Sequence, residues 1–218
     1  MAAAVDDLPH ILVVDDDRRI RQLLQSYLLE NEFRVTVAAS AAEAREKMRG
    51  VVFDAETKMK GIRLDIADYR RPDPKCAPVH AKAAGLYMIC TISKHKAEKK
   101  GCADAMMLDW QGRVAECTGA NIFFTRDGAI HTPIADCFLN GLTRQTVIAL
   151  AKEQGMEIIE RRILPDELPS FNECFIVGSA AEVTPVAEIG LHKFKPGNIS
   201  RAMMDAYSNA VRPKAKAV

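Results

Sequence analysis

The chain has 218 residues and a formal net charge of +1, and 48% of its residues are hydrophobic, so it can bury the core of one or two domains. This near-neutral balance gives no general reason to expect nucleic acid or an anionic membrane as a partner. No apolar run approaches the length of a membrane span, and the five histidines show no metal-ligand spacing. The six cysteines form no CxxC pair and follow no signal peptide, which predicts reduced thiols in a cytoplasmic protein.

The first part of the chain predicts alternating strands and helices. A β-branched run opens it, and apolar residues then recur at three- and four-residue steps. Ser40, with Glu43 in the capping-box position, predicts the start of a second helix. This order predicts the right-handed start of a doubly wound α/β sheet. The predicted elements are strands over 11–14, 33–38 and 51–53 and helices over 20–28 and 40–48.

Residues 10–54 resemble the first part of a response-regulator receiver domain, which has a flavodoxin-like fold. By that resemblance Asp15 and Asp16, at the end of the first strand, would help to hold a magnesium ion if the segment retains such a site. The family continues with an apolar strand that ends in the phosphoaccepting aspartate. Here residues 55–61 are neither apolar nor acidic at their end. The resemblance therefore implies a truncated receiver, and it leaves a phosphorelay signalling protein as an alternative function.

After Gly61 the pattern changes to short strands and hairpins with three helices. One hairpin turns at Gln111-Gly112 and another at residues 126–128. A tight loop over 178–185 feeds a further strand, and a basic tail follows the last helix. The predicted strands cover 62–69, 105–110, 114–116, 121–124, 129–131, 156–164 and 174–177, and the predicted helices cover 86–99, 141–150 and a final stretch from Asn198 or Ser200.

Four segments of this second part carry chemistry that fits one cofactor. Lys82 lies among small residues, which lets a planar group approach its amine. Glu116 places a carboxylate at the end of a predicted strand. The helix start at 141–144 offers free backbone N–H groups to a phosphate, and residues 178–180 form a second such turn with a hydroxyl. An amine, a carboxylate and two anion-binding turns are what pyridoxal 5'-phosphate requires.

These segments resemble the class IV, branched-chain-type aminotransferases. The stretches AKAAGLY, ECTGAN, GLTR and GSAAEVTPV occur in family order, within about residues 58–210. The resemblance implies that Lys82 forms the Schiff base with the cofactor and later moves a proton at the substrate Cα. It also assigns the remaining contacts: Glu116 to the pyridine nitrogen, Tyr87 to the ring oxygen, Leu142 and Thr143 to the phosphate through backbone amides, Ser179 to the phosphate through its hydroxyl, and Ser179 and Ala180 to the substrate carboxylate.

In that family a smaller N-terminal domain precedes the lysine and supplies a phosphate-binding arginine. Here about eighty residues precede Lys82, and only Arg70 or Arg71 is a candidate replacement. We therefore expect a truncated receiver-like segment over 1–54, a connector over 55–75 and a cofactor-binding domain over 76–218. The expected fold class is mixed α/β and α+β: a βαβα fragment of a flavodoxin-like receiver joined to the large C-terminal domain of a fold-type IV pyridoxal-phosphate enzyme.

The expected function is pyridoxal-phosphate-dependent transamination between a branched-chain-type amino acid and 2-oxoglutarate, impaired because the small domain is missing. The expected partners are small amino acids and 2-oxo acids and a second copy of the chain, which would form a homodimer through the C-terminal domain. A D-amino-acid aminotransferase or an aminodeoxychorismate lyase would share the lysine and the carboxylate. A non-catalytic relic that folds or dimerises only through its C-terminal half is a further alternative.

Overall fold

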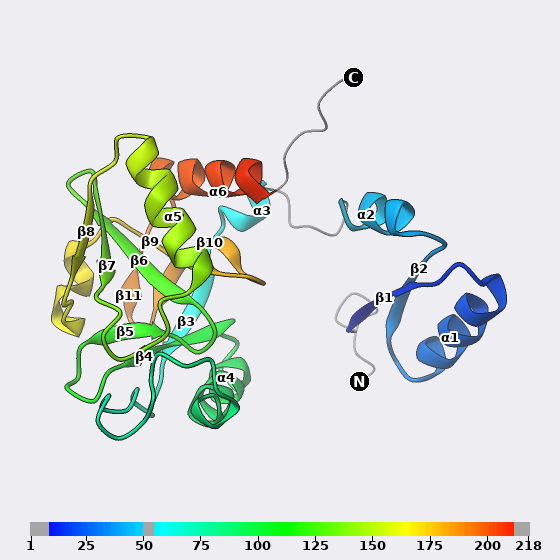
Figure 1. The fold of residues 1–218 in the computed structure, drawn as a ribbon, viewed down its shortest axis with the longest axis horizontal. Coiled ribbons are helices and arrows are strands. Elements are labelled where there is room, and N and C mark those ends of the chain that lie inside the picture. The colour runs from blue at the N-terminus through cyan, green and yellow to red at the C-terminus, as the bar shows by residue number, and fades with distance from the viewer. Residues whose placement is uncertain (1–8, 50–54, 212–218) are drawn as a thin grey trace. The chain divides into compact units, whose positions relative to one another are not determined.

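The computed structural model describes residues 9–49 and 55–211, which form two compact units (Figure 1). Unit 1 comprises Met1–Asp54 and unit 2 comprises Ala55–Val218, and each is treated by itself. The strand predicted over 51–53 and the basic tail lie outside the described residues. Within the described residues, no helix is both long and apolar enough to cross a membrane.

Unit 1 contains the first two predicted strands and both predicted helices. Its elements are β1 His10–Val14, α1 Arg18–Glu30, β2 Arg34–Ala38 and α2 Ala41–Arg49. The strands pair in parallel, with Val13 opposite Val37, as expected when a helix connects them. The predicted cap of the second helix is also present, since the Glu43 N–H donates to Ser40 Oγ at 3.1 Å.

The apolar side chains of α1 are less buried than its periodic pattern predicts. None of its residues is buried, and Leu23 and Tyr27 are 72% and 61% exposed. Periodicity identifies the apolar face of a helix, but burial needs a sheet wide enough to cover that face. Among the described residues of unit 1, the sheet has two strands.

Unit 2 is built on a mixed nine-stranded sheet. Its strands are β3 Ile62–Ile66, β4 Asp104–Leu108, β5 Val114–Cys117, β6 Asn121–Arg126, β7 Ala129–Pro133, β8 Ile158–Arg161, β9 Glu173–Gly178, β10 Glu182–Ile189 and β11 His192–Lys193. Their order is β5-β4-β3-β10-β9-β6-β7-β8, and β11 pairs with β10. Both predicted hairpins are confirmed, because β4 pairs antiparallel with β5 and β6 with β7.

Three helices longer than a single turn accompany the sheet in the described part of unit 2. The helices of this unit are α3 Ala55–Lys58, α4 Met88–Lys99, α5 Leu142–Glu153 and α6 Asn198–Val211, with 3₁₀ turns at Ala84–Leu86 and Pro165–Ser170. The helices α5 and α6 lie side by side, whereas α4 contacts β3 and β4 (Figure 1). The helix predicted from residue 86 thus begins as a 3₁₀ turn, and its α-helical part starts at Met88.

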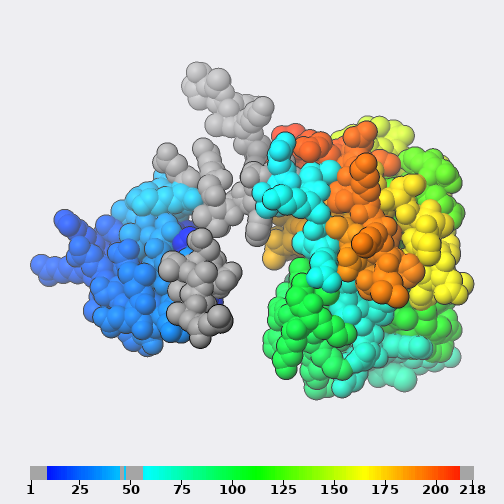
Figure 2. Space-filling view, turned by 180° about the vertical axis from the view of Figure 1, so that it is seen from behind, coloured from blue at the N-terminus to red at the C-terminus, as the bar shows by residue number. Residues whose placement is uncertain are grey.

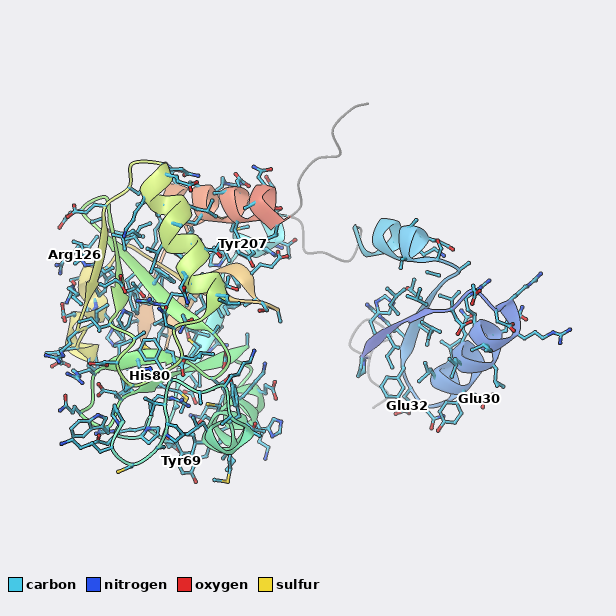
Figure 3. The ribbon with its side chains drawn as sticks, viewed as in Figure 1. Glu30, Glu32, Tyr69, His80, Arg126 and Tyr207 are labelled. Atoms are coloured by element: carbon cyan, nitrogen blue, oxygen red, sulfur yellow. The ribbon has the colours of Figure 1, made fainter. Side chains whose placement is uncertain are left out.

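Side chains alternate across the central strands and build a core on each face of the sheet. Phe123 of β6 stacks on Phe175 of β9, with ring centroids 5.1 Å apart, and both belong to a core cluster with α5 and α6. Tyr207 of α6, labelled in Figure 3, belongs to the same cluster. The next residue, Phe124, instead joins Phe171 in the core of the opposite face.

The connector predicted over 55–75 contains a central element of the sheet. Strand β3 lies between β4 and β10, parallel to both. Figure 2 shows the cyan atoms at the start of unit 2 next to the orange atoms from the β10–β11 region. The strand is shorter than the predicted 62–69, because after Ile66 the chain leaves the sheet. Strand β8 is likewise shorter than the predicted 156–164.

Candidate active site

The four predicted segments meet at one cavity of about 330 Å³ in unit 2. Its walls come from the segment between β3 and α4, the β5–β6 turn, the start of α5 and the β9–β10 turn. The predicted residues that line it are Lys82, Tyr87, Glu116, Leu142, Thr143 and Ser179. Ala180, the remaining predicted residue of this unit, is exposed and is not part of the lining.

The segment that carries Lys82 has little regular structure. It joins β3 to α4 and also contains Tyr69 and His80, which are labelled in Figure 3. Lys82 is exposed, so in this structure its ammonium group remains accessible to water. Tyr87 is half-buried, and burial, followed by the negative charge of Glu116, raises the pKa of its hydroxyl.

Glu116 is the buried acid of the cavity. It lies on β5 and is 9% exposed. Burial raises the pKa of its carboxyl group from 4.5 to about 8, and the positive charge of Arg71 opposes that rise. Burial therefore favours the protonated form of this carboxyl group.

Arg71 is a site residue that the sequence indicated only as a substitute phosphate ligand. It is 4% exposed, and its Nε lies 3.2 Å from Glu116 Oε1. Its backbone N–H donates to the Leu108 carbonyl oxygen of β4, which places the side chain beside β5. The structure thus shows Arg71 as the partner of the buried acid. Its neighbour Arg70 is exposed.

The start of α5 forms a second side of the cavity. Gly141 is the N-cap residue and has no side chain that could accept the first N–H groups of this twelve-residue helix. The next two residues, Leu142 and Thr143, line the cavity. Free N–H groups and the helix dipole favour an anion at such a position.

The β9–β10 turn contributes Ser179 to the same cavity. Gly178 lies close to the β5–β6 turn, because a Cβ atom on it would be 3.3 Å from the Gly119 carbonyl oxygen. This close approach brings the Ser179 side chain to the cavity lining. The cavity therefore combines an accessible amine, a buried acid and an uncapped helix start, and these groups fit pyridoxal phosphate.

The acidic cluster of unit 1 has other partners. The Asp17 carboxylate accepts the Arg19 N–H at 2.7 Å and caps α1, and Asp15 Oδ1 accepts the Asp17 N–H at 2.8 Å. The Arg21 guanidinium donates to the carbonyl oxygens of Asp15 and Asp16. Across residues 9–49 and 55–211, no group of three or more His, Cys, Asp or Glu side chains could hold a metal ion.

Comparisons with known proteins agree on one family. The sequence model described as amino-transferase class IV matches residues 5–189. A probable branched-chain-amino-acid aminotransferase of Rickettsia conorii is 40% identical over 157 residues, which cover 70% of this chain and 54% of that protein. The branched-chain-amino-acid aminotransferase of Pseudomonas aeruginosa is 36% identical over 171 residues, which cover 77% and 56%.

Solved structures agree with these relatives. The branched-chain amino acid aminotransferase of Thermobaculum terrenum, in its PLP-form, superposes with a TM-score of 0.66 at 35% identity, over 69% of this chain and 51% of that one. The enzyme of Thermoproteus uzoniensis with norvaline gives a TM-score of 0.68 at 37% identity, over 71% and 52%. The chain thus spans about half the length of the relatives it matches.

The comparisons do not support the receiver-like interpretation of the first 54 residues. The family match itself begins at residue 5, within the segment where that resemblance was seen. The fold is a mixed α/β fold like that of the class IV aminotransferase structures. Class IV aminotransferases depend on pyridoxal phosphate, which agrees with the groups that line the cavity. The chain belongs to the amino-transferase class IV family.

Proposed function

We propose that this chain binds pyridoxal phosphate in the cavity of unit 2 and serves transamination between a branched-chain-type amino acid and 2-oxoglutarate. The observation that carries the proposal is the convergence of Lys82, Glu116 and the start of α5 on one cavity. The names of the relatives support the branched-chain class of substrate over the D-amino-acid and aminodeoxychorismate alternatives.

Each residue has a role that follows from its position. When bound, the cofactor withdraws electrons from the substrate Cα and so makes the proton there acidic. Lys82 would hold the cofactor covalently, and once the amino group of the substrate has displaced it, its freed amine would move that proton. Glu116 shares its own proton with the ring nitrogen, and Tyr87 donates its hydroxyl to the ring oxygen. The backbone N–H groups of Leu142 and Thr143 bind the phosphate.

The β9–β10 turn has two roles in this proposal. The hydroxyl of Ser179, which lines the cavity, adds a hydrogen bond to the phosphate. The backbone of Ser179 and Ala180 then receives the carboxylate of the amino-acid substrate. The exposed position of Ala180 suits this second role, because a substrate can reach it from solvent.

We propose that activity is weak, because Lys82 is exposed to solvent. Water that reaches the amine weakens every electrostatic interaction around it. Among the described residues of unit 2, no arginine other than Arg71 lines the cavity, and Arg71 is engaged with Glu116. A site that lacks one charged contact to the phosphate binds it less tightly by about 1.5–3 kcal/mol, which is roughly tenfold to over a hundredfold in affinity.

We propose a cofactor-binding domain over 76–218 and an additional segment over 1–54; the connector expected over 55–75 contributes β3 to the sheet of unit 2. The parallel β1–β2 pair with α1 between them supports a receiver-like origin of that segment. We also propose a homodimer in the cytoplasm, formed through unit 2. The exposed apolar side chains of Met88 and Ile92, one turn apart on α4, support such a contact.

Covalent trapping tests the proposal. Borohydride added to the protein with pyridoxal phosphate should attach the cofactor to Lys82, and peptide mass spectrometry should locate it there. Lys82→Ala should remove the adduct, whereas Lys75→Ala, a change to an exposed lysine of the same segment, should leave it intact. An adduct on another lysine, or none at saturating cofactor, would refute the proposed function.

A further inference from the structure

Asn121 connects the two ends of the cavity through a single side chain. It begins β6, is 6% exposed and belongs to the cavity lining. Its Nδ2 donates to Glu116 Oε2 at 3.3 Å and to the Leu139 carbonyl oxygen at 3.0 Å. Leu139 lies in the loop that leads into α5. The same amide group therefore contacts the acid at one end and the backbone near the anion-binding helix start at the other.

The orientation of this amide group is determined by its neighbours. The Leu139 carbonyl oxygen can only accept a hydrogen bond, so the amide nitrogen must face it. The Oδ1 atom then faces Gly141, where a Cβ atom would be only 2.7 Å away. The glycine at the N-cap of α5 is therefore needed because the Asn121 side chain occupies the space beside its backbone.

The two oxygens of Glu116 have different partners. Arg71 lies 3.2 Å from Oε1 and supplies positive charge, whereas Asn121 donates a neutral hydrogen bond to Oε2. Charge changes the protonation of the carboxyl group, and a directional hydrogen bond fixes where it points. Of these two partners, only Asn121 also holds the loop before α5.

We propose that Asn121 is a positioning residue that sets the spacing between Glu116 and the start of α5. A ligand with a ring nitrogen at one end and a phosphate on a short arm at the other can meet both ends only over a narrow range of separations. This inference rests on the proposed function, because it takes pyridoxal phosphate as that ligand. Asn121 acts through Glu116 and the Leu139 loop and need not touch the reacting atoms.

A spacing role and a purely structural role of Asn121 can be told apart by comparing ligands with and without a phosphate group. If Asn121 sets the spacing, removing its side chain weakens the binding of a ligand that uses both ends more than that of a ligand that uses one. Pyridoxal, which lacks the phosphate, uses only the ring end. A purely structural role would weaken the binding of both ligands by the same factor.

The experiment titrates the full chain with pyridoxal phosphate and with pyridoxal and follows the absorbance of the bound ligand. Asn121→Ala should weaken pyridoxal phosphate about 10- to 100-fold and pyridoxal by about threefold or less. Asn172→Ala, a change to an exposed asparagine, should leave both dissociation constants unchanged. Thermal melting without ligand measures any loss of stability separately.

A second variant keeps the Asn121 side chain and moves it. Gly141→Ala introduces a Cβ atom that would clash with Asn121 Oδ1. It should therefore also weaken the binding of pyridoxal phosphate more than the binding of pyridoxal. The Gly141→Ala variant is used in place of Asn121→Ala if the latter fails to fold. Equal loss of both ligands in these variants, or no loss, would overturn the spacing role while leaving the proposed function intact. Failure of the unaltered chain to bind pyridoxal phosphate would overturn both.

Discussion

The buried acid Glu116 should make the stability of unit 2 fall as the pH rises from about 4.5 to about 8. Its pKa is raised from 4.5 to about 8 by burial, so the folded chain holds this proton more tightly than the unfolded chain does. Stability is then full below the unfolded pKa and declines until the folded pKa is reached. At about 1.4 kcal/mol for each pH unit between the two pKa values, the loss across this window is about 4–5 kcal/mol.

Glu116→Gln removes this titration while keeping the shape of the side chain. Without cofactor, we take the free energy of unfolding of the variant minus that of the unaltered chain. This difference should increase by about 4–5 kcal/mol between pH 4.5 and pH 8. Urea unfolding followed by circular dichroism at pH 5, 6, 7 and 8 measures this difference, in which the other titrating groups cancel. Glu98→Gln, at an exposed glutamate of α4, serves as the control. A difference that stays constant over this range would refute the reasoning.

Two further changes test other contacts. Arg71→Gln removes the charge that lowers the pKa of Glu116 and should therefore raise that pKa above about 8. In the same unfolding series, the pH above which stability stops falling should then move upward. An unchanged pH profile would contradict the pairing of Arg71 with Glu116. Glu173→Leu removes the carboxylate that accepts hydrogen bonds from three N–H groups at the start of α6, at 2.8–3.3 Å. The free energy of unfolding, measured by urea unfolding, should fall by about 1–3 kcal/mol. A loss well below that would mean that water replaces the carboxylate.

Local patterns were sufficient to predict most elements of unit 2. Alternation with period two predicted the hairpins, since each is closed by a short turn that its own residues specify. The helix from Gly141 was predicted from apolar positions that run on to Leu150, which is likewise a pattern of neighbouring residues. The four motifs were grouped by their chemistry, and the segments that carry them line one cavity.

The tertiary structure decided which groups from distant segments meet. Arg71 pairs with Glu116, 45 residues away, because β3 and β5 both flank β4 in the sheet. No local pattern specifies that neighbour, so the sequence indicated Arg71 only as a phosphate ligand. The raised pKa of Glu116 likewise depends on burial by several elements, and the contacts of Asn121 depend on how the loop before α5 folds back.

The distinction between what the sequence predicted and what the tertiary structure decided has a physical cause, which unit 1 also illustrates. The sequence by itself determined which face of α1 is apolar, because periodicity is a property of neighbouring residues. Whether that face is buried depends on the surface offered by the rest of the fold, and in the described part of unit 1 Leu23 and Tyr27 remain exposed. Secondary structure and capping follow from short-range geometry, whereas burial, ion pairing and pKa values follow from packing between residues far apart in the chain.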